Sequence, residues 1–356
     1  MSTVSVYASE PAFPTLAHSL LSQTSSDPGN PVHQTETETE SVSLQNESVP
    51  SDNWDLKYDI DRGIRAAGTF RCGKVIGFSR LRRHGNDDDP HCVTQLPLHL
   101  LTKHLHESPE SQSPSPNVFI IHPANFSAFS PKTLLAALLS PDHDPSLSQN
   151  EAIRRLDSVQ LLPVYDFRSA AQAINEVSEA LHKIQEERHH LASQSQSNQP
   201  ASTNPVIFII AGLDTLTEGV IRSSNPGKGA AVLTATLRTL TQLSQMYAFL
   251  SVWLVNTSGL GSVGSGSNVN AGTIAGGQSQ AAGLQNEDSR QVRDDTIHSV
   301  FRQTGTPLFP SLMTRVLDQG IDTHLLISSV GNTQVVEIIK DRADGGVGKW
   351  CAWNAK

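Results

Sequence analysis

The sequence predicts an α/β protein built on a mainly parallel, twisted β-sheet with helices on both of its faces. Two observations carry this prediction. Short runs of consecutive apolar residues recur along the chain, and such runs are typical of strands buried on both faces. Between them lie longer segments whose apolar residues recur every three or four positions, as on one side of a helix. Parallel neighbours need such crossover helices, and the helices then cover the sheet.

The strands are expected where the apolar runs are bounded by polar or turn-forming residues. In chain order they are residues 74–79, 118–121, 160–164, 205–210, 250–255, 323–328, 335–339 and 350–353. Pro163 lies in the third of them. Because proline has no N–H to give to the ladder, that strand is expected to be short or at an edge.

Amphipathic helices are expected over residues 94–104, 131–139, 167–191 and 230–247. The last of them places Leu233, Leu237, Leu240 and Leu243 on one stripe. Three low-complexity stretches interrupt the alternation, at residues 106–117, 193–204 and 258–300. Loops of this length are uncommon in a compact domain unless they are functional or disordered.

The N-terminal segment differs in composition from the rest of the chain. Residues 1–55 are rich in Ser, Thr, Pro, Gln and Glu, and they contain eight acidic residues and no Lys or Arg. Such a segment cannot bury enough apolar surface to offset its chain entropy. We therefore expect a disordered acidic tail over residues 1–55, followed by a core over residues 56–356.

The net charge of −9 belongs almost entirely to this tail, which contributes −8 and leaves a core with 26 basic and 27 acidic side chains. A core this close to neutral is not basic enough to hold DNA strongly by itself. No apolar stretch reaches the length of about 18 residues that a membrane span needs, and the N-terminus lacks the basic and apolar regions of a secretory signal. Three widely spaced cysteines fit a reducing compartment.

Residues 68–74 match the spacing of a phosphate-binding loop, GxxxxGK. Val75 follows where a Ser or Thr would ligate magnesium, and Lys74 opens a predicted strand although such a loop should follow one. We therefore interpret the match as chance. His91, Cys92 and His99 lie close in sequence, but no second ligand pair has a suitable spacing, so no metal site is expected.

The turn after the first predicted strand is where a phosphate loop belongs, and here a family resemblance is visible. The run GKVIGFS at residues 73–79, followed by TQLPLHLL at 94–101, resembles the opening of the RecA-type core of the eukaryotic strand-exchange recombinases and their paralogues. Four later stretches of the chain also resemble successive parts of this core: residues 119–135, 206–216, 222–259 and 322–353. The resemblance covers most of residues 60–353 and implies a RecA-like P-loop NTPase fold.

The resemblance also implies where a nucleotide would bind. Aligned on Thr94, Gln95 and Leu96, the phosphate-binding lysine of the family falls on Val93, and the glycine before it falls on Cys92. Thr94 keeps the hydroxyl on the magnesium side. The turn itself is not rich in glycine and carries three consecutive aspartates, which would repel a triphosphate.

The other polar groups of the family site are also replaced. The glutamate that activates water falls on Ala124, the Walker B aspartate on Ala211 and the sensor glutamine on Thr257, while Asn256 fits the family pattern. Asp214 lies three residues too late for the metal-binding aspartate, unless the register is shifted. The resemblance therefore implies a degenerate nucleotide site with no catalytic residue.

Two groups of basic residues are candidate DNA contacts. Arg222 and Lys228 lie in the stretch that resembles the first DNA loop of the family, and a second cluster is formed by Arg80, Arg82 and Arg83. Basic residues in ordinary solvent-exposed loops, with no role in DNA binding, explain both groups equally well. Residues 258–300 take the place of the second DNA loop but are almost uncharged, so any affinity for DNA should be modest and sensitive to salt.

Phosphoryl transfer needs a lysine on the phosphates, a held metal ion and a group that orients water. The replacements therefore predict a non-catalytic recombinase paralogue in homologous-recombination DNA repair, in the nucleus. It would act as an adaptor that binds a RecA-type recombinase or a sister paralogue and contacts single- or double-stranded DNA, with no cofactor and no membrane. Two alternatives stay open: a weak DNA-dependent ATPase in which Lys74 and Asp214 converge on ATP and Mg²⁺, and an unrelated α/β binding module.

Overall fold

The computed structural model describes residues 55–64, 68–82, 92–107, 116–140, 147–194, 204–261, 299–301, 308, 311–330, 333–342 and 345–353. The predicted acidic tail lies outside these residues except for Asp55, whose side chain accepts a hydrogen bond from the Lys57 N–H at the start of the first helix. Most of each predicted low-complexity insert also lies outside them.

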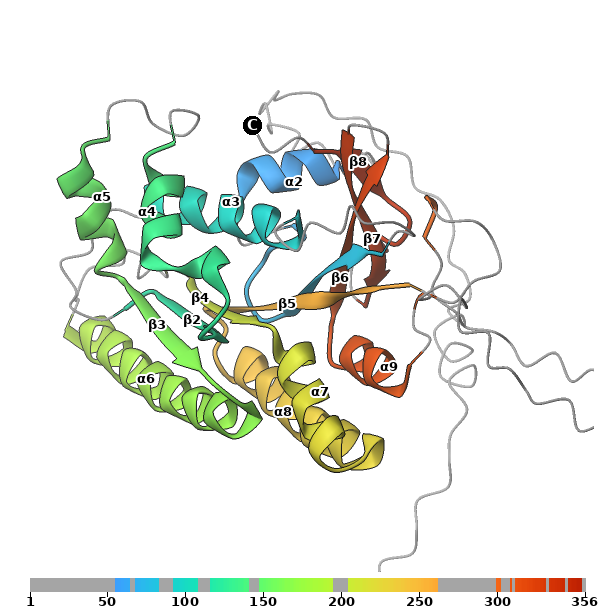
Figure 1. Cartoon of the computed structure of the whole chain (residues 1–356). Coiled ribbons are helices and arrows are strands. Elements are labelled where there is room, and N and C mark those ends of the chain that lie inside the picture. The colour runs from blue at the N-terminus through green and yellow to red at the C-terminus, as the bar shows by residue number, and fades with distance from the viewer. Residues whose placement is uncertain are drawn as a thin grey trace, which may run out of the picture. The chain divides into compact units, whose positions relative to one another are not determined.

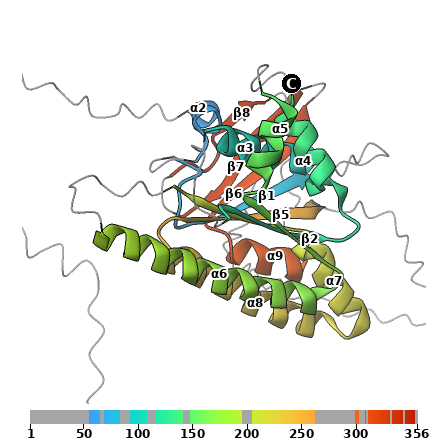
Figure 2. The same ribbon diagram turned by 90° about the vertical axis from the view of Figure 1, so that its left-hand side faces the viewer.

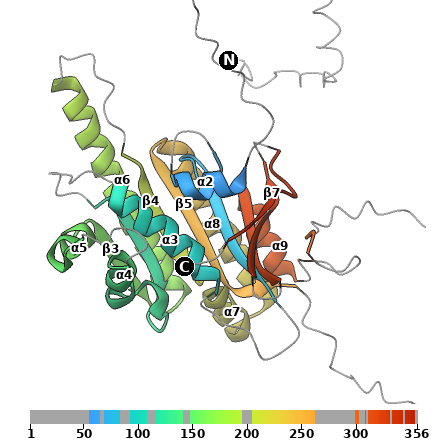
Figure 3. The same cartoon turned by 90° about the horizontal axis from the view of Figure 1, so that it is seen from above.

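One eight-stranded sheet organises the described part of the chain (Figure 1). Its spatial order is β3-β2-β4-β5-β1-β6-β7-β8, and every pair from β3 to β6 is parallel, whereas β7 and β8 are antiparallel to their neighbours. The strands are β1 (Val75–Leu81), β2 (Val118–Pro123), β3 (Val159–Val164), β4 (Val206–Ala211), β5 (Leu250–Leu260), β6 (Thr323–Val330), β7 (Thr333–Asp341) and β8 (Trp350–Ala352). Figure 3 shows β3 and β7 toward opposite sides of this sheet.

Helices cover both faces of the sheet (Figure 2). One face carries α2 (Leu56–Arg62), α3 (Cys92–Glu107), α4 (Pro131–Leu138) and α5 (Gln149–Leu156). The other carries α6 (Phe167–Gln194), α7 (Leu213–Ser223), α8 (Pro226–Met246) and α9 (Leu312–Gln319). The predicted fold class, a mainly parallel α/β sheet covered on both faces, is therefore confirmed.

The central strands are apolar throughout because both of their faces are covered. In β4, Ile207 and Ile209 pack into the core beneath α2–α5, whereas Phe208 and Ile210 pack into the core beneath α6–α9. Successive side chains of a strand point to opposite faces, so a strand between two helical layers needs an apolar residue at every position. This burial explains why strand positions could be predicted from composition alone.

The predicted strands and helices are present, with bounds that differ by a few residues, and β3 with Pro163 is an edge strand as expected. Four helices were not predicted: α2, α5, α7 and α9. They are 7 to 11 residues long, and their starts depend on local caps, such as Ser148 before α5 and the mutual Ser311–Thr314 contacts that open α9. Strand β5 continues to Leu260, into the stretch that was predicted as an insert.

Candidate functional site

Six neighbouring parallel strands, from β3 to β6 in the sheet order, end at the same side of the sheet, which we call the carboxyl edge. In open α/β sheets, ligands bind outside this edge. Ala211 lies level with Val255, and Ser79 lies level with Asn256, so the ends of β4, β5 and β1 are in register. Ala211 and Asn256, two of the candidate nucleotide-site residues, therefore lie at this edge.

The start of α3 packs into the core. Val93, in the position of the family lysine, is completely buried and belongs to the same apolar cluster as Ala211. Thr94 is also buried, while Cys92 is half-buried. The Gln95 amide oxygen accepts a hydrogen bond of 2.7 Å from the Gln334 Nε2 on β7. The side chains at the start of this helix thus serve packing and contacts to the sheet.

Ala124 follows β2 at the carboxyl edge and is exposed. Its N–H donates a hydrogen bond of 2.8 Å to the carbonyl oxygen of Val164 at the end of β3. The methyl group offers no proton acceptor, so this position has no group that could orient a water molecule.

Asp214 lies in the first turn of α7 and is almost completely buried. Its carboxylate accepts hydrogen bonds from the Thr257 Oγ1 at 3.2 Å and from the Ser258 N–H at 2.5 Å. Both donors belong to β5, so the carboxylate fixes the end of β5 against the start of α7. This contact also accounts for Thr257, which takes the place of the sensor glutamine.

Lys74 lies at the opposite end of the sheet. It precedes β1, four residues before Phe78, which is level with Val255 and therefore with Ala211. At about 3.3 Å per residue, Lys74 is roughly 13 Å away along the strand from the edge where Asp214 lies. The Lys74 Nζ is buried and lies 3.9 Å from the Asp341 carboxylate. Lys74 and Asp214 do not converge on a cleft, so the geometry required for the ATPase alternative is not found.

Asn256 belongs to a buried chain of polar groups that the sequence did not indicate. The Asn256 Nδ2 donates to the Ser79 Oγ at 2.8 Å, and the same oxygen lies 2.8 Å from the His324 Nε2. The His324 Nδ1 lies 3.0 Å from the Asp318 Oδ1 in α9, and Lys340 lies 3.0 Å from the Asp318 Oδ2. One direction of donation satisfies every member: Ser79 donates to His324, and His324 donates to Asp318.

Burial controls the protonation of this chain. It lowers the pKa of His324 below its ordinary value, although the neighbouring Asp318 carboxylate acts in the opposite direction. Burial also raises the pKa of Asp318, but the hydrogen bond and charge of His324 and the charge of Lys340 outweigh it and leave a lowered value. Because Ser79 and His324 are completely buried, the chain ties α9 to the sheet and does not present a nucleophile to solvent.

A second unpredicted carboxylate, Glu337 on β7, is completely buried. It accepts hydrogen bonds of 2.6 Å from the Ser299 Oγ and 2.7 Å from the Val300 N–H. Asp214 and Glu337 therefore hold the two ends of the 258–300 stretch in the same way, each through one hydroxyl and one backbone N–H. The isolated carboxylate in the apolar run 335–339 was the only sequence signal for this site.

The basic cluster at the end of β1 lies at the carboxyl edge, with Arg80 in the strand and Arg82 just after it. The Arg80 and Arg82 side chains flank Gly259 of β5, where an added Cβ would lie 3.2 and 3.0 Å from their Cγ atoms. Gly259 has φ = +71°, a conformation that favours glycine. Arg83 lies outside the described residues. Arg80 and Arg82 are thus placed together next to the stretch that resembles the second DNA loop.

The prediction that Arg222 and Lys228 lie in a loop is wrong. Arg222 is in α7, where it pairs with Glu218 at 2.9 Å, and Lys228 is in the first turn of α8. Only Ser224 and Asn225 separate the helices, and the Asn225 side chain accepts a hydrogen bond from the Lys228 N–H. Both basic side chains are exposed at the tip of this helix pair, with 79% of the Arg222 side chain accessible.

Neither a metal-binding group nor a membrane-spanning helix is found among the described residues. Among the described residues, no group of three or more His, Cys, Asp or Glu side chains is arranged to hold a metal ion. In the same part of the chain, no helix combines the length and apolarity that crossing a membrane requires.

The fold, a mainly parallel α/β sheet between two helical layers, and the polar contacts at its carboxyl edge can be compared with known proteins. No protein-family model matches the sequence, and no curated protein matches it. Among solved structures, the chain is similar to the crystal structure of the RadB recombinase, with 12% sequence identity and a TM-score of 0.44. The similarity covers 80% of this chain and 88% of that one, and it concerns the fold only.

Proposed function

We propose that this protein is a non-catalytic paralogue of the RecA-type recombinases that acts as an adaptor in homologous recombination and DNA repair in the nucleus. The observation that carries the proposal is the carboxyl edge, where Val93 and Ala211 belong to the apolar core and Asp214 is occupied by β5. A triphosphate needs positive charge and a held metal ion at this edge.

Four polar groups of the family site are replaced under the resemblance, and not one alone. Loss of a single preorganised electrostatic group typically costs about 3–4 kcal/mol at the transition state. Under the alignment, Val93, Ala124, Ala211 and Thr257 stand where four such groups would act. A lysine placed at position 93 would also bury its ammonium group in the cluster that contains Ala211, which is unfavourable without a partner.

An adaptor needs a surface for its partner, and the edge strand β3 supports one. Among the described strands, β3 pairs only with β2, so its outer main-chain groups are open to an added strand. Pro163 removes one donor from that side, but Tyr165, directly after the strand, is 85% exposed. An aromatic side chain next to an open strand edge is a suitable anchor for a recombinase or a sister paralogue.

DNA would then be reached mainly together with the partner. The core is close to neutral in charge, and Arg80 and Arg82 supply only a small basic cluster at the carboxyl edge. Direct binding should therefore be weak and should fall steeply with salt.

The first test is nucleotide binding by the purified full-length chain, with a fluorescent ATP analogue, Mg²⁺ and a RecA-type recombinase as the positive control. We expect no saturable binding in the micromolar range and no phosphate release. Micromolar binding with turnover would refute the non-catalytic assignment. The second test is binding to a purified RecA-type recombinase, which should weaken at least about tenfold in Tyr165→Asp, or about 1.4 kcal/mol. Tyr58→Asp, at an exposed tyrosine on α2, is the matched control.

A further inference from the structure

Two adjoining pockets form a groove between α8, α9 and the amino edge of the sheet, where β1 and β6 begin. Their volumes are about 360 and 480 Å³, and they share Arg342. We call them together the α8–α9 groove. Its lining residues are Arg71, Cys72, Gly73, Lys74, Thr234, Leu237, Arg238, Thr241, Gln242, Gln245, Val316, Gln319, Gly320, Asp322 and Arg342. This groove lies at the amino edge of the sheet, whereas the candidate nucleotide-site residues lie at the carboxyl edge.

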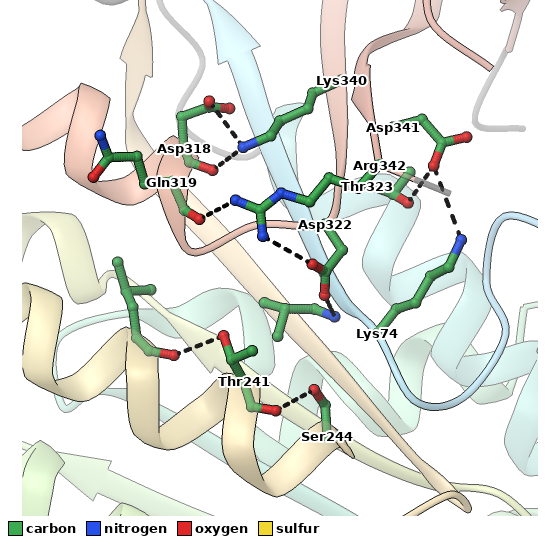
Figure 4. Close-up of polar contacts among 12 residues, drawn as sticks. Lys74, Thr241, Ser244, Asp318, Gln319, Asp322, Thr323, Lys340, Asp341 and Arg342 are labelled. Carbon is green, nitrogen blue, oxygen red and sulfur yellow. Dashed lines mark hydrogen bonds and ion pairs between the residues drawn. The ribbon is translucent and has the colours of Figure 1, made fainter. Parts of the chain in front are cut away.

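The described lining carries four cationic side chains and a single carboxylate, Asp322. That carboxylate is already occupied: its Oδ1 accepts from the Arg342 Nη1 at 3.2 Å and its Oδ2 from the Val75 N–H at 2.9 Å (Figure 4). Arg238 is exposed on α8, and no ion pair is found for it within the described part of the chain. Lys74 is also paired, with the Asp341 carboxylate at 3.9 Å, so the positive charge that the groove offers to a ligand lies mainly on Arg238 and on the half-exposed Arg342 guanidinium.

The floor of the groove is apolar and its rim is rich in amides. Leu237 and Val316 are buried in the core cluster beneath α6–α9, and Gly320 lets α9 approach α8 so closely that an added Cβ would lie 2.7 Å from the Leu237 Cβ. Gln242 and Gln319 stand beside this floor. Side-chain amides both donate and accept, so they suit the main chain of a bound peptide.

The cationic side is held in place before any ligand arrives. The Arg342 Nη2 donates to the carbonyl oxygen of Gln319 at 2.5 Å, at the end of α9, while its Nη1 holds Asp322 (Figure 4). Lys340, two residues earlier, binds the Asp318 carboxylate at 3.0 Å and the Asp318 carbonyl oxygen. A guanidinium fixed in this way loses little side-chain entropy when it binds a carboxylate.

We propose that the α8–α9 groove binds an acidic segment of a partner protein in which carboxylates alternate with apolar side chains. The carboxylates would meet Arg238 and Arg342, and an apolar side chain would contact Leu237 and Val316. A peptide is favoured over nucleic acid because the floor of the groove is apolar, which suits an apolar side chain and offers no contact to a phosphate backbone. This proposal goes beyond the adaptor function and does not depend on it, since it concerns a different surface from β3.

The test measures fluorescence polarisation of labelled 12-residue peptides with the full-length chain. The probes are a pool with Asp or Glu at half of the positions and Leu, Ile or Phe among the rest, the same pool with Ser for the apolar residues, and a single-stranded oligo(dT). We expect saturable binding of the first pool and at least about tenfold weaker binding of the second.

Two variants locate the binding. Arg238→Glu should weaken the acidic-apolar pool at least about tenfold, whereas Arg154→Glu, an exposed arginine on α5, should leave it unchanged. Thr241→Trp fills the groove without changing charge and should also weaken it, and thermal unfolding checks that each variant is folded. Absence of saturable binding overturns the proposal, as does an equal effect of the two arginine variants. Competition by oligo(dT) that persists in Thr241→Trp would show a nucleic-acid surface instead and would also overturn it.

Discussion

Replacing His324 tests whether the buried polar chain stabilises the fold or serves chemistry. In His324→Leu, the Ser79 hydroxyl loses its acceptor and the Asp318 carboxylate loses one donor, while the side-chain volume changes little. Each buried polar group left without a partner costs about 1–3 kcal/mol. We therefore expect the free energy of unfolding to fall by about 2–5 kcal/mol, a large part of the 5–15 kcal/mol typical of a domain.

The same residue makes stability depend on pH. Burial lowers the pKa of His324 in the folded chain, and burial lowers the pKa of His104 to about 4, while a histidine in the unfolded chain titrates near 6.5. Below about pH 6.5 the unfolded chain therefore binds protons that the folded chain does not, and stability falls as the pH is lowered toward the folded pKa values. Each group contributes at most about 1.4 kcal/mol per pH unit, and neither contributes above this window.

The assay is urea unfolding between pH 7.5 and 5, followed by fluorescence with the buried Trp253 as the main reporter. This range stays above the window in which Asp318, whose pKa is lowered, loses its charge. His182→Leu, at an exposed histidine on α6, is the matched control. The reasoning is refuted if His324→Leu is as stable as the control at pH 7.5, or if both lose stability equally between pH 6.5 and 5.

Three further predictions concern the carboxyl edge. Asp214→Ala should destabilise the protein by about 2–4 kcal/mol in urea unfolding, because the Thr257 hydroxyl and the Ser258 N–H lose their acceptor. The control Glu218→Ala, in the same helix, should cost less than about 1 kcal/mol. Equal losses of stability in the two variants would contradict the structural role of Asp214. Gly212→Ala should lower the free energy of unfolding by about 1–3 kcal/mol, because φ is +70° and the added Cβ would lie 2.8 Å from the Pro123 Cγ. Gly219→Ala should be stabilising, because Gly219 lies inside α7 with open space around it. A Gly212→Ala variant as stable as the unsubstituted protein would contradict this prediction. In the double variant Arg80→Glu, Arg82→Glu, the slope of log K for DNA binding against log salt concentration should become shallower than in Arg154→Glu, by the amount expected for about two phosphate contacts. An unchanged slope would exclude these side chains as DNA contacts.

The central strands were predictable because burial on both faces requires an apolar residue at nearly every position, and their short length and bounding turn residues favour a strand over a buried helix. The short helices were not, because α5 buries only Ala152 and starts at the Ser148 cap, and α7 follows Gly212, so both starts resemble loop sequence. Arg222 and Lys228 show this most clearly. Pro226, Gly227 and Gly229 suggest a loop, yet Pro226 opens a helix after the Asn225 cap, and Gly229 is needed where α8 packs against Ile221 of α7.

The sequence predicted which positions of the family nucleotide site carry other residues here, but it did not predict which residues those side chains contact. Ser79 and His324 are separated by 245 residues, and Glu337 and Ser299 by 38, so local periodicity gives no sign that they meet. Lys74 illustrates the opposite case, because its spacing resembles a phosphate loop while its position before β1 directs it to the amino edge. Local patterns fix which residues are buried, whereas the partners of buried polar groups depend on sheet order.

The two ends of the sheet use their polar groups differently. At the carboxyl edge, Asp214 and Asn256 are satisfied by other strands and helices, so binding a nucleotide there would require breaking contacts that stabilise the fold. At the amino edge, Arg342 is held by main-chain and carboxylate contacts, and the groove beside it also carries the exposed Arg238. The two edges therefore differ in what they offer a ligand: the polar groups at the carboxyl edge are used within the fold, whereas the groove at the amino edge presents the exposed Arg238.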